Sequence, residues 1–425
     1  MRSVLKYLCL LVGLLVVLPL TPIAEKGGWG AAQAQQNQPV QIDELLSAVQ
    51  GTSDTLQISL LTCAPGTEVY ELYGHSALRV KHLARGTDWV FNYGIFDFST
   101  PNFIWRFMLG QTDYTVAASP YDYFCAAYQY EGRAVSEQVL NLTPAEEARM
   151  FATVYQHAQQ KGWSYRYNFL YDNCVTRLIK MIEESVDGQI VWPKAEEGKR
   201  TFRDMLHESS QEQSPWSSFG QDLILGQEVD EPLSVHLQMF SPICAERFVC
   251  EAVIRGADGQ TRPLVKEPSP TIASIPAASE ISGGGISPTL VVSLLAIVLL
   301  LISVWEMKRR KVIMALDNVI LSVRGVLGIL VALLFFASEH PAVGSNWLIL
   351  FLNPLPLLIL IWKICGNRAE KHQRLLKFMV AEPVLVGIVL LLSPQTISVA
   401  IYVFLASLAL RGVLEYKTLR GNKTT

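Results

Sequence analysis

Residues 171–177 read Tyr-Asp-Asn-Cys-Val-Thr-Arg, and this short stretch decides how the rest of the chain is interpreted. Asp172 and Asn173 are residue types that cap helix N-termini, and apolar residues at 178, 179, 181 and 182 follow them with helical spacing. The stretch therefore predicts a helix that begins at Cys174. At a helix N-terminus the unpaired backbone amides and the positive end of the dipole favour the thiolate, the form of cysteine that attacks a carbonyl carbon.

A second chemical signal lies upstream, where residues 73–80 read Tyr-Gly-His-Ser-Ala-Leu-Arg-Val. His75 opens a run that alternates as a strand does. A cysteine and a histidine are the smallest set of side chains for thiol-dependent acyl transfer. The cysteines and histidines show no paired spacing typical of metal ligands, so we expect neither a metal nor another cofactor.

The composition indicates a membrane protein that carries one exported domain. The chain has 425 residues, 50% of them hydrophobic, and the apolar excess lies at its two ends. The net charge of −3 argues against nucleic acid as a partner. Arg2 and Lys6 precede an apolar run at 7–20, and Ala-Gln-Ala at 32–34 offers a cleavage site, so we expect residues 1–34 to be a signal peptide. An uncleaved anchor helix is the alternative, and both place the chain from residue 40 onward outside.

The C-terminal third predicts an all-α membrane domain of about five helices. Apolar stretches lie at 288–305, 312–337, 347–365, 378–393 and 397–410, each near the roughly 20 residues that cross a bilayer. Clusters of lysine and arginine follow the first stretch, separate the third from the fourth, and follow the last. Because such clusters stay on the cytoplasmic side, we expect a multi-pass inner-membrane protein with a cytoplasmic C-terminus. The loops at 338–346 and 393–395 then face the exported side.

Residues 35–267 are long enough to form a folded domain of their own, which we expect to be α+β. Strand patterns lie at 56–61, 76–81 and 88–93, with a turn at 85–86 between the last two. Helical patterns cover 144–160, after a start signal at Thr143, and 174–184. Residues 268–287 are rich in proline, serine, alanine and glycine, and we interpret them as a linker into the membrane domain at 288–425.

Five cysteines fall in the predicted exported domain: Cys63, Cys125, Cys174, Cys244 and Cys250. Outside the cytoplasm cysteines tend to pair, and an odd number leaves at least one thiol free. Pairs of Cys244 with Cys250 and of Cys63 with Cys125 would leave Cys174 free. The alternative is that every thiol is reduced and packs as a small hydrophobic side chain.

Several ordered motifs together resemble the bacterial Lnb-type lipoprotein N-acyltransferases. The resemblance covers nearly the whole chain, including two short motifs in the membrane part at 338–341 and 353–355. The exported motifs lie at 60–66, 73–80, 91–98, 130–133 and 172–174. The resemblance implies a periplasmic thiol-dependent domain followed by membrane helices. Its implied reaction moves a fatty acyl chain from a phospholipid donor to the α-amine of a diacylglyceryl-cysteine on a lipoprotein acceptor. The order of histidine before cysteine is also similar to the permuted papain-type fold, with the histidine on a strand and the cysteine at a helix start.

These observations assign a role to each site residue as a hypothesis. Cys174 attacks the ester carbonyl, His75 moves the proton, and a thioester links the two half-reactions. A third polar group should hold the His75 ring, and we nominate Asn92 ahead of Asp97 because it lies on the strand expected next to that of His75. The backbone amide of Cys174 is the expected oxyanion donor, and Arg177 either lowers the cysteine pKa, contacts phosphate or is structural.

Cys63 is the rival nucleophile, since it lies twelve residues before His75, but no helix follows to activate it. Two other classes of function stay open. One is a membrane-anchored peptidase or amidase that uses the same pair on cell-wall peptides. The other is a receptor or assembly factor without enzymatic activity, in which Cys174 and His75 have only structural roles.

Overall fold

The computed structural model describes residues 56–66, 71–96, 100–210, 214–269, 286–364 and 368–421. The predicted signal peptide at 1–34 and most of the predicted linker at 268–287 lie outside the described residues. The chain divides into two compact units. We call the described residues within 27–213 and 231–283 the α+β unit, and those within 214–230 and 284–425 the helical unit.

An antiparallel sheet of seven strands forms the centre of the α+β unit, in the order β10-β5-β1-β2-β3-β4-β6. Its strands are β1 (Leu56–Cys63), β2 (His75–His82), β3 (Thr87–Ile95), β4 (Asp113–Pro120), β5 (Val135–Leu140), β6 (Tyr165–Arg166) and β10 (Val265–Ser269). The three predicted strands lie within β1, β2 and β3. Gly86 supports the predicted turn between β2 and β3, because its φ of 71° suits glycine.

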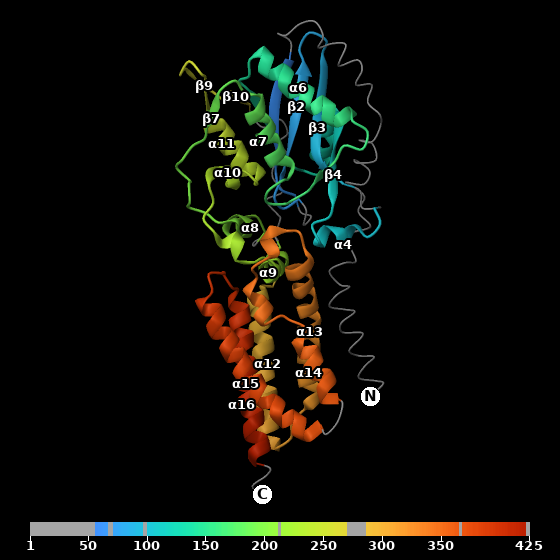
Figure 1. The fold of residues 1–425 in the computed structure, drawn as a ribbon, viewed down its shortest axis with the longest axis vertical. Coiled ribbons are helices and arrows are strands. Elements are labelled where there is room, and N and C mark those ends of the chain that lie inside the picture. Colours follow the sequence, from blue (N-terminus) through green and yellow to red (C-terminus); the bar gives the residue numbers. More distant parts are fainter. Residues whose placement is uncertain are drawn as a thin grey trace. The chain divides into compact units, whose positions relative to one another are not determined.

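Helices cover the sheet, and a three-stranded sheet lies beside it (Figure 1). The helices of this unit are α4 (Phe103–Met108), α5 (Tyr121–Tyr130), α6 (Pro144–Gln159), α7 (Cys174–Ser185), α8 (Phe202–Ser210), α10 (Val235–Gln238) and α11 (Pro242–Glu251). The smaller sheet consists of β7 (Gln189–Val191), β8 (Val253–Arg255) and β9 (Thr261–Pro263). The unit is therefore α+β, as the sequence predicts.

The central strands alternate between two buried faces, as the pleat requires. Leu61 and Val90 pack against Phe124 of α5 on one face. Tyr93 points to the other face, where its hydroxyl meets His157 of α6 and Met181 of α7. α5 and the pair α6–α7 thus cover opposite faces, and α7 packs against β2 and β3.

The predicted start of α6 is a complete capping box. The Thr143 side chain accepts from the Glu146 amide, and Glu146 Oε2 accepts from the Thr143 amide at 2.7 Å. Glu146 is also fully buried, accepts from the Asp187 amide at 2.7 Å and pairs with Arg262 at 2.6 Å. One carboxylate therefore joins α6, the end of α7 and β9.

The helical unit contains three helices long and apolar enough to cross a membrane among the described residues, namely 288–309, 314–337 and 399–419. Its elements are α9 (Pro215–Ile224), η1 (Gln227–Asp230), α12 (Pro288–Arg309), α13 (Met314–Ala337), η2 (Pro341–Val343), η3 (Trp347–Leu350), α14 (Leu355–Ile364), α15 (Arg368–Leu392) and α16 (Val399–Gly421). The stretch 347–365, predicted as one span, is divided between η3 and α14. The break falls before Pro354, which disfavours helical backbone at Asn353.

Charged side chains buried among these helices are paired. Arg411 of α16 is fully buried and contacts Glu306 at 2.8 Å, Asp317 at 2.8 Å and Glu415 at 2.5 Å. A charge taken out of water is costly unless it is paired, so Arg411 and its acidic partners must stay in contact. These ion pairs therefore hold α12, α13 and α16 together at one place.

The segment 214–230 belongs to the helical unit although the sequence places it within the predicted exported domain. Phe219 and Leu223 of α9 pack against the apolar core of the membrane helices. The Gly226 amide donates to the Ala342 carbonyl at 2.8 Å. Two further side chains of the helical unit hydrogen-bond to this segment. Asn346 donates to the Leu223 carbonyl at 2.9 Å, and Gln395 donates to the Leu225 carbonyl at 3.0 Å. The described chain therefore passes from the α+β unit into the helical unit and back before its membrane helices begin.

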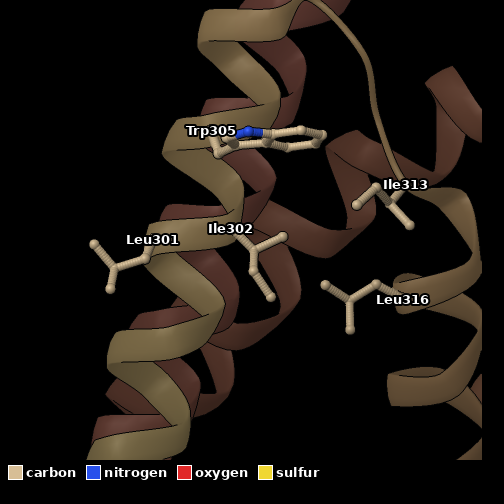
Figure 2. A pocket seen from close by; sticks show the side chains of 5 residues that line it. All are labelled: Leu301, Ile302, Trp305, Ile313 and Leu316. Carbon is tan, nitrogen blue, oxygen red and sulfur yellow. The ribbon is translucent and has the colours of Figure 1, made fainter.

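A hollow of about 500 Å³ lies between α12 and the start of α13. Figure 2 shows the hydrophobic side chains that line it: Leu301, Ile302 and Trp305 of α12, Ile313 just before α13, and Leu316 of α13. This surface suits hydrocarbon and offers no charged group for a polar ligand.

Candidate active site

Cys174 is the first residue of α7, and a second capping box holds it there. The Asn173 side chain accepts from the amides of Val175 and Thr176 at 3.0 Å, while the Thr176 hydroxyl accepts from the Asn173 amide at 2.8 Å. Asn173 also donates to the carbonyls of Phe169 and Phe240 at 2.9 Å. The thiol is therefore fixed at the positive end of an amphipathic helix whose apolar side is buried in the core.

His75 is the first residue of β2, and the fold brings it to the thiol. α7 packs against β2 and β3, and the His75 ring forms a hydrogen bond with Cys174. Gly94 of β3 lies beside Cys174, and its φ of 92° is one that residues other than glycine rarely adopt. A Cβ at Gly94 would lie 3.6 Å from Cys174 Cβ. The glycine leaves backbone, rather than a side chain, beside Cys174.

Asn92 of β3 holds the other side of the histidine ring. His75 Nε2 lies 2.5 Å from Asn92 Oδ1, and Asn92 is buried. An amide oxygen only accepts, so Nε2 carries the proton and Nδ1 is the nitrogen left for the thiol. The sequence nominated Asn92 ahead of Asp97; Asp97 lies outside the described residues.

The electrostatics of the pair favour a thiolate beside an imidazolium. Burial by itself raises the pKa of Cys174, but the charge and hydrogen bond of His75 and the backbone amides of Ser76 and Val175 outweigh it, so the pKa lies below that of an ordinary thiol. Burial likewise lowers the pKa of His75, but Cys174 and Asn92 outweigh it and raise the pKa above its usual value. Opposite shifts of this kind pre-form the nucleophile of a cysteine hydrolase or transferase.

Cys63, the rival nucleophile, has the opposite environment. It is fully buried opposite His75 on the β1–β2 ladder and packs in the apolar cluster under α5. Burial raises the pKa of Cys63 to about 12, so it stays a neutral thiol.

The expected disulfides do not form, because all five cysteines of the α+β unit are free thiols. Cys244 and Cys250 lie on one helix, α11, where the first is buried and the second exposed. Six residues along a helix place two side chains on different sides, beyond the reach of a disulfide. Cys125 packs near Cys63 in the cluster under α5 without bonding to it.

Arg177 lies one turn into α7 and is paired with Asp172 through two hydrogen bonds of 2.7 Å. Its guanidinium also lies 4.1 Å from the centroid of the Tyr165 ring. Asp172 therefore serves as a counter-ion, whereas Asn173 is the cap.

Two tyrosines near the thiol were missed by sequence reasoning. Burial, the largest cause, and the neighbouring Cys174 raise the pKa values of Tyr165 and Tyr167 well above the usual value, so both phenols are neutral. Their only signal in the sequence is the aromatic run just before residues 171–177, which does not show which ring reaches the site.

Family comparisons agree with this division into two parts. The model of the Lnb N-terminal periplasmic domain matches residues 48–206, which include Cys174, His75 and Asn92. The model of the Lnb transmembrane domain matches residues 279–422. No curated protein and no solved structure gives a significant match.

Proposed function

The chain belongs to the Lnb family, and we infer that it transfers a fatty acyl chain from a phospholipid, through a thioester on Cys174, to the N-terminal amine of a diacylglyceryl-cysteine lipoprotein. The observation that carries this proposal is the contact of Cys174, His75 and Asn92 within the region matched by the periplasmic domain. Their strand and helix positions also support a permuted papain-like arrangement.

In the first half-reaction the Cys174 thiolate attacks the carbonyl carbon of a phospholipid ester. The new carbon–sulfur bond forms a tetrahedral oxyanion, which the backbone amide of Cys174 is placed to stabilise because the Asn173 cap takes the amides of Val175 and Thr176 instead. The carbon–oxygen bond then breaks, and the lysophospholipid alkoxide leaves with the proton of His75.

In the second half-reaction the lipoprotein amine attacks the thioester carbonyl. His75, now neutral, takes a proton from the attacking nitrogen. The carbon–sulfur bond breaks, the amide is released, and the thiolate and imidazolium return to their starting states. This sequence predicts ping-pong kinetics, because the lysophospholipid leaves before the amide forms.

The helical unit suits substrates that stay in a bilayer. Moving an acyl chain into water costs about 0.8 kcal/mol per methylene, so an enzyme that works at the membrane surface avoids that cost. The packing of 214–230 on the loops at 341–347 and 395–396 supports an exported location for those loops, in agreement with the positive charges expected on the cytoplasmic side.

Mass spectrometry of acyl adducts tests the proposal. Detergent-purified protein is incubated with phospholipid and no acceptor, with Cys174→Ala as the control. We expect a hydroxylamine-sensitive adduct on Cys174 that the control lacks. An adduct on Cys63 would contradict the site assignment, and no adduct in folded, lipid-bound protein would contradict the acyltransferase. Cleavage of soluble cell-wall peptides by the wild type would then favour the peptidase.

A further inference from the structure

Tyr165 has a buried hydroxyl without a hydrogen-bond partner among the described residues. The residue opens β6, opposite Tyr114 of β4, and is 5% exposed. Its hydroxyl oxygen lies 4.0 Å from the point where Gly94 would carry a Cβ, and Cys174 Cβ lies 3.6 Å from that same point. The Tyr165 hydroxyl and the nucleophile therefore border one small space above Gly94.

The ring of Tyr165 is held firmly on its other sides. Arg177 lies 4.1 Å from its centroid and is itself fixed by Asp172, while the Trp163 ring lies 5.7 Å away. A buried tyrosine hydroxyl normally finds a partner, and one left unpaired next to a reactive group is typical of a site that bonds a ligand or transition state. Burial also keeps the phenol protonated, so it is a donor at neutral pH.

Given the proposed acyl transfer, we propose that Tyr165 is a catalytic residue whose Oη–H donates, together with the backbone amide of Cys174, to the carbonyl oxygen that becomes an oxyanion. Both half-reactions pass through such an oxyanion on the same acyl carbon, so one donor serves both. The hydroxyl keeps its proton throughout. Gly94 is part of the arrangement because a side chain there would fill the space that the acyl carbonyl must enter.

The test compares Tyr165→Phe with two other hydroxyl deletions. Tyr114→Phe is the matched control, because Tyr114 is directly paired with Tyr165 on the neighbouring strand and is equally buried. Tyr167→Phe tests the neighbouring phenol. Two rates are measured for each variant: single-turnover acylation of Cys174 by a phospholipid, and alkylation of Cys174 by iodoacetamide, which forms no oxyanion.

We expect Tyr165→Phe to slow acylation by about 100- to 1,000-fold, as loss of one oxyanion donor does elsewhere. Alkylation should keep its wild-type rate, and the unfolding temperature should not fall because no hydrogen bond is lost. Tyr114→Phe should acylate normally.

Three results would overturn the assignment: normal acylation of Tyr165→Phe, equal loss of acylation and alkylation, or a loss confined to Tyr167→Phe. Failure of the wild type to acylate, with Cys174 alkylated normally, would instead refute the proposed function on which this inference rests.

Discussion

Replacement of Asn92 by alanine tests how much the third polar group contributes to the site. The change deletes the acceptor 2.5 Å from His75 Nε2 and leaves the half-buried ring free to turn away from the thiol. A hydrogen bond to a charged group contributes about 1.5–3 kcal/mol. At about 1.36 kcal/mol per tenfold change, Asn92→Ala should slow acylation of Cys174 by about 10- to 150-fold.

The assay is single-turnover acylation at pH 7, accompanied by the pH dependence of iodoacetamide alkylation. Because Asn92 helps raise the pKa of His75, its loss should lower that pKa. A less protonated His75 lowers the pKa of Cys174 less, so the pH profile of alkylation should shift to higher pH. Asn141→Ala is the control, since Asn141 donates to the Pro263 carbonyl at another part of the sheet. Normal acylation and an unshifted alkylation profile in Asn92→Ala would refute the reasoning.

Three further changes have defined outcomes. His75→Ala should slow alkylation of Cys174 at pH 7 by about tenfold or more, because burial then raises the thiol pKa unopposed by the imidazolium. Glu146→Gln should lower the free energy of unfolding by about 1.5–3 kcal/mol in urea titrations at pH 7. The pKa of Glu146 is lowered on folding from its usual 4.5. The difference in unfolding free energy between wild type and Glu146→Gln should therefore be full above pH 4.5 and disappear as pH falls through the folded pKa. Gly226→Ala should expose 214–230 to limited proteolysis, because its Cβ would clash with a backbone carbonyl, whereas Gly220→Ala should not.

Each of these changes has a result that contradicts it. Alkylation of His75→Ala at the wild-type rate would mean that the helix start alone activates the thiol. A stability loss in Glu146→Gln that persists at low pH would assign it to packing instead of charge. Equal cleavage of the two glycine variants would show that the close approach at Gly226 does not hold the segment.

Features that depend on neighbouring residues were predictable from the sequence. The cap at Asn173 and the apolar spacing after it predicted that α7 begins at Cys174, and Thr143 predicted the start of α6. Alternation predicted β1 to β3, and apolar length predicted the three long membrane helices. Each of these signals lies within a single helix or strand, where chain connectivity already places the residues together.

The site needed contacts between segments far apart in the chain. Asn92 meets His75 only because β2 and β3 pair in a register that brings both to one face, and Tyr165 reaches Cys174 only because β6 joins the far edge of the same sheet. Cysteine spacing suggested disulfides, but the thiols are separated by helix geometry and packing. Composition assigned 214–230 to the exported domain, whereas its contacts place it with the membrane helices. Local patterns were sufficient to predict β1, β2, β3, α6 and α7 and to nominate Cys174 and His75 as candidate site residues. Which segments meet depended on the tertiary structure, because pairing and packing depend on distances that no local pattern encodes.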